Sequence, residues 1–325
     1  MNQSATARPV LWITRKLSRR TEERAARDYE VILNPDDTLS SADDIIAMSK
    51  RVDAILPCHS EVFSAEVVKR LDARVRIIAN HSVGTDHCDL AALAARGIVV
   101  TNTPDVLSDA TAEIAMLLLL GAARRAAEGD RLVREGRWTS WSPSFMVGHQ
   151  VTGKRLGIIG MGKVGRVMAA RARGFDMEVH YHNRTRLDPS LEEGAVYHDS
   201  IESLLPNCQF LSLHCPATPA TRGIMNAGRF ALLPDGAVFV NTARGALVDE
   251  DAMLDAIASG KVAAAGLDCF AVEPGGNPKF ADHENIFMLP HIGSATFETR
   301  DAMGFRALDN IDAFFAGREP GDRVA

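Results

Sequence analysis

Cysteine is scarce in this sequence, and no two cysteines form a closely spaced CxxC pair. Disulfide frameworks and structural zinc sites need cysteines in even numbers or at short spacings. Neither is therefore expected, and the cysteines are predicted to be reduced thiols. They are Cys58, Cys88, Cys208, Cys215 and Cys269.

Long apolar runs and basic blocks are also missing. The longest apolar run, from Ile114 through Ala123, is about half the roughly 20 residues that a membrane-spanning helix requires. The first residues lack the apolar core of a signal peptide. With a net charge of −6 and no lysine or arginine cluster, the chain lacks the footprint of a nucleic-acid-binding protein. We therefore expect a cytoplasmic protein with no membrane or nucleic-acid partner.

The 325 residues, 46% of them hydrophobic, are enough for two domains with separate cores. Short apolar runs typical of strands alternate with polar segments of helix length, and this pattern predicts α/β units with parallel sheets. The strand-like runs fall into two series. The first comprises residues 10–14, 31–33, 54–57, 77–80 and 98–101, and the second 155–159, 178–182, 210–214, 237–242, 262–268 and 286–290.

Three glycines, Gly160, Gly162 and Gly165, open the segment after the first strand of the second series. In a βαβ unit the first permits a tight turn, the second lets backbone approach a pyrophosphate, and the third allows close helix packing. The phosphates lie at the N-terminus of the helix, which is predicted over residues 163–173. The residues of this turn expected to bind a dinucleotide are Gly160, Met161, Gly162, Lys163, Val164 and Gly165.

The position of this turn predicts the domain order. Because it lies in the second series, the coenzyme domain is central in the chain. We predict two doubly wound parallel-sheet domains: a Rossmann coenzyme domain at residues 104–292, inserted in a flavodoxin-like substrate domain formed by residues 1–103 and 293–325. Pro104 and Gly293 mark the expected crossovers. A ligand is expected in the cleft between the domains.

The residues after the second Rossmann strand indicate which dinucleotide binds. A NAD site usually carries Asp or Glu about 20 residues after the glycines, but this chain has Asn183, Arg184, Thr185 and Arg186. A carboxylate repels a 2′-phosphate, whereas a guanidinium binds it. Asn183, Arg184 and Thr185 are therefore predicted to bind NADP, with NADPH preferred and NAD as the second cofactor considered. The alternative is that both arginines are solvated loop residues.

Further motifs resemble the D-isomer-specific 2-hydroxyacid dehydrogenases across essentially the whole chain. They are TPDVLSDATAE (103–113), LHCPATPATRG (213–223), NTARGALVDE (241–250), GLDCFAVEP (266–274) and LPHIGSAT (289–296). Within that family the chain looks most like the glyoxylate and hydroxypyruvate reductases. The resemblance implies an NAD(P)-dependent oxidoreductase that reduces these small 2-keto acids to glycolate and D-glycerate by hydride transfer.

The resemblance also supplies the catalytic residues. It implies that His291 is the general acid and base, that Glu273 is its acidic partner, and that Arg244 anchors the substrate carboxylate. Histidine suits proton transfer because its pKa lies near neutrality, and a planar guanidinium grips a carboxylate with two hydrogen bonds. The implied substrate-binding residues are Ser82, Val83, Gly84, Arg244 and His291.

Other positions correspond to coenzyme contacts in the family, with Asp268 near the nicotinamide carboxamide. They are Thr111, Cys215, Pro216, Thr221, Thr242, Ala243, Asp268, His291 and Gly293. The segment LPCHS (56–60) corresponds to a region that shapes the substrate side-chain pocket. Cys269 stands where many relatives carry Val, and as a small buried hydrophobe it is expected to be tolerated.

The family expectation is a homodimer. Trp138 and Trp141 could contact a second subunit, line the substrate pocket or simply pack. The apolar helix expected at 112–123 is hydrophobic nearly all round and is predicted to pack between subunits or domains.

No metal site is expected, because the histidines at 81, 87, 180 and 182 form no ligand set. Two alternative functions stay open. One is a D-2-hydroxyacid dehydrogenase for a larger 2-keto acid. The other is a dinucleotide-sensing scaffold like the transcriptional co-repressors that share this fold.

Overall fold

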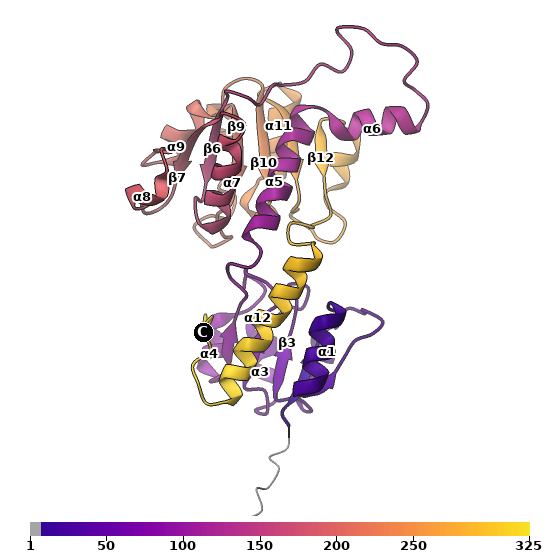
Figure 1. Cartoon of the computed structure of the whole chain (residues 1–325), viewed down its shortest axis with the longest axis vertical. Helices are drawn as coiled ribbons and strands as arrows, with labels where there is room; N and C mark the ends of the chain where they lie inside the picture. The colour runs from indigo at the N-terminus through magenta and orange to yellow at the C-terminus, as the bar shows by residue number, and fades with distance from the viewer. Residues whose placement is uncertain (1–7) are drawn as a thin grey trace, which may run out of the picture. The chain divides into compact units, whose positions relative to one another are not determined.

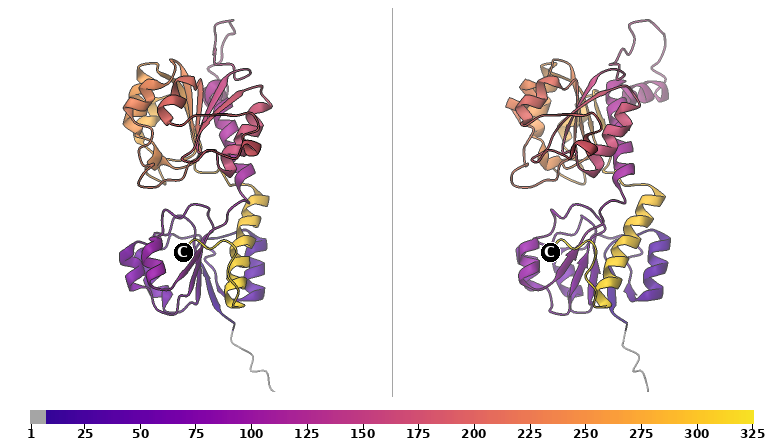
Figure 2. Two further views of the ribbon diagram at one scale, coloured as in Figure 1. Left: turned by 90° about the vertical axis from the view of Figure 1, so that its left-hand side faces the viewer. Right: turned by 60° about the vertical axis from the view of Figure 1, so that its left-hand side comes forward.

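A computed structural model describes residues 8–325 (Figure 1). The contacts divide the chain into two compact units, which we call the first and second unit. The first unit contains the residues up to Leu107 together with Ala295–Ala325, and the second contains Ser108–Ser294. Within each unit, helices cover both faces of a sheet (Figure 2).

The first unit has a five-stranded parallel sheet in the order β2-β1-β3-β4-β5. This is the strand order of flavodoxin-like folds. The strands are β1 (Val10–Ile13), β2 (Glu30–Ile32), β3 (Ala54–Leu56), β4 (Ile77–Ala79) and β5 (Val99–Thr101). The helices are α1 (Arg19–Asp28), α2 (Ala42–Ser49), α3 (Ala65–Arg70), α4 (Leu90–Ala95) and α12 (Phe297–Phe315). β1, β3 and β4 are fully buried, as expected for strands covered on both faces.

The second unit has a seven-stranded parallel sheet in the order β12-β11-β10-β9-β6-β7-β8. The strands are β6 (Arg155–Ile159), β7 (Glu178–His182), β8 (Val196–Tyr197), β9 (Phe210–Leu213), β10 (Ala237–Asn241), β11 (Val262–Leu267) and β12 (Ile286–Met288). The six strands from β8 to β11 follow the Rossmann strand order, with β6 as the first strand of the fold. In this order the crevice for a dinucleotide lies beside the first strand.

Seven α-helices and three short 3₁₀ helices connect these strands in the second unit. The α-helices are α5 (Ser108–Ala123), α6 (Ala126–Arg134), α7 (Lys163–Arg173), α8 (Pro189–Glu192), α9 (Ile201–Leu204), α10 (Ala227–Leu232) and α11 (Glu250–Ala258). The 3₁₀ helices are η1 (Leu205–Asn207), η2 (Gly245–Leu247) and η3 (Pro278–Asp282).

The apolar helix α5 packs on the sheet of its own unit. A Cβ added to Gly266 of β11 would lie 2.8 Å from atoms of Leu118, and one added to Gly121 would lie 2.2 Å from the Phe287 ring. The helix also contacts α7. The expectation that it packs between subunits or domains is therefore wrong for most of its surface, because the hydrophobic sides are covered by β10, β11, β12 and α7.

The predicted fold class is confirmed: both units are doubly wound parallel-sheet α/β structures. The predicted strands agree with the observed ones to within a residue or two at each end. The two-residue edge strand β8 was not predicted, because so short a strand leaves no apolar run in the sequence. Among the described residues, every helix is too short or too polar to cross a membrane.

Candidate coenzyme and catalytic site

The glycine-rich turn joins β6 to α7. Gly160 has a φ of +95°, and a Cβ there would lie 2.4 Å from the backbone nitrogen of Cys215. A Cβ on Gly165 would lie 2.5 Å from the carbonyl oxygen of Gly160. Only glycine meets these constraints without displacing backbone. The turn therefore packs directly on the loop after β9, and the first turn of α7 packs on the glycine-rich turn itself.

Gly162 differs from its two neighbours because space is open around it. It is the N-cap residue of α7, and a Cβ there would meet no atom within 4 Å. The first N–H groups of an α-helix have no partner within the helix, and the helix dipole favours an anion beside them. The space that a side chain at position 162 would occupy therefore fits the pyrophosphate of a dinucleotide.

Asn183 ties the end of β7 to this turn. Its Oδ1 accepts a hydrogen bond from the N–H of Met161 at 2.6 Å, and its Nδ2 donates to the Met161 carbonyl at 3.4 Å. The residues that follow Asn183 are thereby held beside the glycine-rich turn, where the ribose of a bound dinucleotide would lie.

The two arginines of the next loop have different environments. Arg186 forms a bidentate ion pair with Glu192, at 2.7 and 3.0 Å, and lies over the ring of Tyr197. The Tyr181 hydroxyl also donates to Glu192, at 2.7 Å. These hydrogen bonds, chiefly the one from Arg186, lower the pKa of Glu192 to about 2.

Arg184 and Thr185 are exposed, as Arg186 is, but Arg184 has a different environment. Within residues 8–325, the Arg184 side chain makes no hydrogen bond or ion pair. The sequence predicts Arg184, but not Arg186, as a coenzyme contact. It does not predict the ion pair of Arg186, because the burial of Glu192 beside Tyr181 leaves no local signal.

The loops after β9 and β10 line the same edge of the sheet. Cys215 is buried, and the Thr221 hydroxyl donates to the Pro216 carbonyl at 2.6 Å, which closes the turn 216–221. The N–H of Ala243 donates to Oδ1 of Asn241. The Thr242 hydroxyl is buried, and no described residue hydrogen-bonds to it. A buried hydroxyl normally has a partner, so this position fits contact with a bound molecule.

Asp268, directly after β11, organises the loop that contains His291. Its fully buried carboxylate accepts the N–H groups of Ile292 at 2.8 Å and Gly293 at 2.7 Å. Burial raises the pKa of the Asp268 carboxyl, although these two hydrogen bonds oppose the shift. A Cβ on Gly293 would lie 3.1 Å from Asp268 and 3.5 Å from Thr111 of α5, so these three residues pack together.

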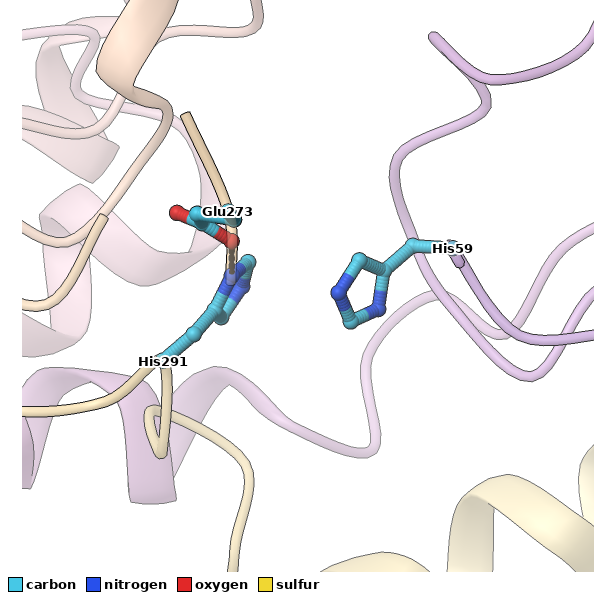
Figure 3. A group of neighbouring side chains, drawn as sticks. All are labelled: His59, Glu273 and His291. Atoms are coloured by element: carbon cyan, nitrogen blue, oxygen red, sulfur yellow. Dashed lines mark hydrogen bonds and ion pairs between the residues drawn. The ribbon is translucent and has the colours of Figure 1, made fainter. Parts of the chain in front are cut away.

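Glu273 and His291 form a hydrogen-bonded pair (Figure 3). Nδ1 of His291 lies 2.5 Å from Oε2 of Glu273, and the other carboxylate oxygen accepts the N–H of Phe270 at 2.7 Å. About a quarter of each side chain is exposed. A carboxylate beside Nδ1 places a proton on that nitrogen and fixes the ring orientation. His59, which Figure 3 also draws, belongs to the first unit.

Arg244 follows β10 and is half-buried. Its Nη1 donates to the carbonyl of Ala243 at 2.8 Å. The next residue, Gly245, packs so tightly that a Cβ there would lie 1.9 Å from the backbone of Phe270. The Cys269 thiol, buried as expected, donates to the Ala243 carbonyl at 3.4 Å. The segment carrying Arg244 therefore lies beside the segment that leads to Glu273.

The loop after β4 in the first unit carries Ser82, Val83 and Gly84. The Ser82 hydroxyl donates to the Gly84 carbonyl at 2.7 Å, and Nδ2 of Asn102 donates to the Val83 carbonyl at 2.8 Å. In the part of the chain that the structure describes, the N–H groups of Val83 and Gly84 donate to no other residue. Two adjacent N–H donors of this kind fit one carboxylate.

Comparison with known proteins assigns the family. A family model described as "D-isomer specific 2-hydroxyacid dehydrogenase, NAD binding domain" matches residues 116–293. The glycerate dehydrogenase of Hyphomicrobium methylovorum is 44% identical over 309 residues, which cover 94% of this chain and 96% of that protein. The chain belongs to the D-isomer specific 2-hydroxyacid dehydrogenases.

Solved structures of this dehydrogenase family share the whole fold. A glyoxylate reductase from Paecilomyes thermophila is 33% identical, with a TM-score of 0.88 and coverage of 98% of this chain and 99% of that chain. An NADPH-dependent glyoxylate/hydroxypyruvate reductase from Sinorhizobium meliloti, in complex with NADP and malonate, is 31% identical, with a TM-score of 0.87 and coverage of 98% and 97%. This dehydrogenase is accordingly an NAD(P)-dependent oxidoreductase.

Proposed function

We propose that this dehydrogenase reduces glyoxylate and hydroxypyruvate to glycolate and D-glycerate, with NADPH as the preferred coenzyme and His291 as general acid and base. The hydrogen bond between His291 and Glu273 carries the proposal. Reduction of a carbonyl by hydride needs a proton donor in a fixed orientation, and this pair provides one. The two substrates are proposed from the names of relatives, a glycerate dehydrogenase and a glyoxylate/hydroxypyruvate reductase.

His291 would move the proton at its Nε2 atom, because Nδ1 is held by Glu273. The bound coenzyme supplies the hydride to the carbonyl carbon. His291, as the imidazolium, donates a proton to the carbonyl oxygen, and the Glu273 carboxylate stabilises the positive ring. In the oxidative direction the neutral ring accepts the hydroxyl proton. One residue therefore serves both directions.

Arg244 is proposed to bind the substrate carboxylate and polarise the adjacent carbonyl. Its side chain is half-buried beside the segment that leads to Glu273, and a guanidinium binds a carboxylate through two parallel hydrogen bonds. The N–H groups of Val83 and Gly84, in the loop that Ser82 holds, are also proposed to bind a substrate carboxylate. The roles proposed for the Arg244 guanidinium and for these two N–H groups rest on the family motif and on the hydrogen-bond donors described above.

The NADPH preference is proposed from the loop after β7. Arg184 is exposed and makes no ion pair with any described residue, whereas Arg186 is bound to Glu192. Because no carboxylate occupies positions 183–186, the 2′-phosphate meets no repulsion there. Arg184 is therefore the guanidinium proposed to bind it, with Asn183 and Thr185 beside it. NAD is the alternative coenzyme.

The other coenzyme contacts are proposed at the same edge of the Rossmann sheet. The residues of the glycine-rich turn would hold the pyrophosphate, and the Thr242 hydroxyl would gain the partner that it lacks among the described residues. Asp268 is proposed to lie near the nicotinamide carboxamide. The remaining proposed contacts are Thr111, Cys215, Pro216, Thr221, Ala243, His291 and Gly293.

Initial rates with glyoxylate, hydroxypyruvate, pyruvate and a branched 2-keto acid, each with NADPH and NADH, test this proposal. We expect the highest kcat/KM for the first two acids with NADPH. Faster turnover of the branched acid would assign the enzyme to larger 2-keto acids instead. Binding of NADPH without turnover of any acid would support a dinucleotide-sensing scaffold.

A homodimer is proposed from the segment between α6 and β6, which extends away from the sheet of its unit (Figure 1). Trp138, Trp141 and Val147 in this segment are 54%, 75% and 64% exposed. Several exposed large apolar side chains in one segment are typical of protein contacts. Sedimentation of wild type and of a Trp138→Ser/Trp141→Ser variant tests the proposal. Wild type is expected to sediment as a dimer, and the variant is expected to dissociate more readily into monomers. The cytoplasmic location stays a prediction.

A further inference from the structure

Two buried polar side chains, Asn80 and His87, stand at the two ends of the loop that carries Val83 and Gly84. Asn80 directly follows β4 and is completely buried, and His87 is 9% exposed. Nε2 of His87 lies 2.8 Å from Oδ1 of Asn80. A hydrogen bond between two buried side chains therefore spans the base of the six-residue loop 81–86.

Asn80 is anchored on the sheet. Its backbone N–H and its Nδ2 both donate to the carbonyl of Thr101 in β5, at 2.9 and 3.0 Å. Since Nδ2 is engaged there, Oδ1 is the atom that faces His87, and Nε2 of His87 must carry the proton. The Cys88 thiol donates to the same Oδ1 at 3.6 Å.

His87 is anchored from the other side. Its backbone carbonyl accepts the N–H of Phe63 at 2.8 Å, and the N–H of Cys88 closes a turn on the carbonyl of Thr85 at 2.9 Å. Both ends of the loop are thus attached to fixed backbone. The hydrogen bond between Asn80 and His87 joins these two anchored ends directly.

We propose that Asn80 and His87 are positioning residues, whose hydrogen bond holds the Val83 and Gly84 N–H groups in the orientation that binds the substrate carboxylate. The inference rests on the proposed function of this loop. The carbonyls of the two peptide groups concerned, those of Ser82 and Val83, accept hydrogen bonds from the N–H of Thr103 at 2.9 Å and from Asn102 at 2.8 Å. These bonds tie the two peptide groups to the segment 102–103, and the hydrogen bond between Asn80 and His87 closes the loop that carries them. Replacing His87 with an apolar residue removes this closure and leaves the buried Oδ1 of Asn80 with only the thiol of Cys88 as a donor.

Steady-state kinetics of His87→Phe and His87→Gln test the inference. Phenylalanine fills similar space but cannot donate a hydrogen bond, whereas the amide of glutamine can donate to Asn80. We expect His87→Phe to raise the KM for glyoxylate about 10-fold, the effect of losing one buried hydrogen bond, with kcat changed less than KM. The Kd of NADPH is expected to stay at its wild-type value, and His87→Gln to restore most of the KM.

Hydrogen exchange of the amides in residues 81–87 gives a second measurement that does not depend on turnover. Exchange should be faster in His87→Phe than in wild type or His87→Gln, at a temperature where all three are folded. A matched control, His283→Phe, changes a partly exposed histidine of the second unit and should alter neither quantity.

An unchanged KM in His87→Phe, a fall in kcat alone, or unchanged exchange would overturn the inference. Equal changes of KM and of amide exchange in His87→Phe and His87→Gln would also overturn it. Should wild type turn over no 2-keto acid with either coenzyme, the proposed function fails and the exchange measurement alone decides whether the hydrogen bond holds the loop.

Discussion

Nδ1 of His291 and the carboxylate of Glu273, 18 residues apart in the chain, lie 2.5 Å from each other. His291 itself has a φ of +54°, and the next two N–H groups are held by the buried carboxylate of Asp268. The imidazole is thus fixed both through its ring and through its backbone. Proton transfer benefits from such a fixed ring, because the donor needs no reorganisation during the reaction.

Removal of this imidazole should abolish most of the activity. We expect His291→Ala to lower kcat for glyoxylate by about 100-fold or more, the usual contribution of a general acid. The Kd of NADPH, measured by fluorescence titration, should change little. His283→Ala serves as a control for loss of a partly exposed histidine. Near-normal turnover in His291→Ala would rule out the proposed proton donor.

Replacement of Arg184 should affect the two coenzymes differently. Arg184→Ala is expected to weaken NADPH binding by about 10- to 100-fold, the range for one charge-assisted hydrogen bond. NADH binding should be almost unchanged, because NADH has no 2′-phosphate. Both Kd values can be measured by fluorescence titration, with the exposed Arg51→Ala as control. Equal losses for both coenzymes would show that Arg184 does not bind the 2′-phosphate.

The ion pair of Glu192 predicts a pH dependence of stability. The folded pKa of Glu192, about 2, lies below the ordinary value of 4.5. The stabilisation from the charged form is therefore fully present above pH 4.5 and is lost as the pH falls toward 2. Glu192→Gln should lower the Tm at pH 7, and the difference from wild type should narrow between pH 4.5 and pH 2. A constant difference over that range would contradict this assignment.

Replacing each of two glycines of the same turn with alanine should affect different properties, the stability in one case and NADPH binding in the other. Gly160→Ala introduces a Cβ at a positive φ and 2.4 Å from backbone, and is expected to cost about 3 kcal/mol of stability, visible as a lower Tm. Gly162→Ala places its methyl group in open space and should leave the Tm nearly unchanged while weakening NADPH binding. Tight NADPH binding by Gly162→Ala would argue against a pyrophosphate at that position.

Local sequence was sufficient to predict most of the second unit's coenzyme fold. The strand 155–159, the glycines after it and the helix 163–173 depend on interactions between near neighbours, so hydrophobic periodicity and turn chemistry specify them. The structure has β6 and α7 at these same residues. The family motifs predicted Arg244, Glu273 and His291 as catalytic residues, but they did not predict which atoms these side chains contact.

Only the tertiary structure shows that Arg186 is paired with Glu192, because that ion pair depends on the burial of Glu192 against Tyr181. It also decides which face of α5 is covered, and it reveals the hydrogen bond between Asn80 and His87. Residue type and periodicity determine which segments form strands and helices. Which charged and polar side chains pair is decided by packing between segments distant in sequence, since burial makes an unpaired polar group costly.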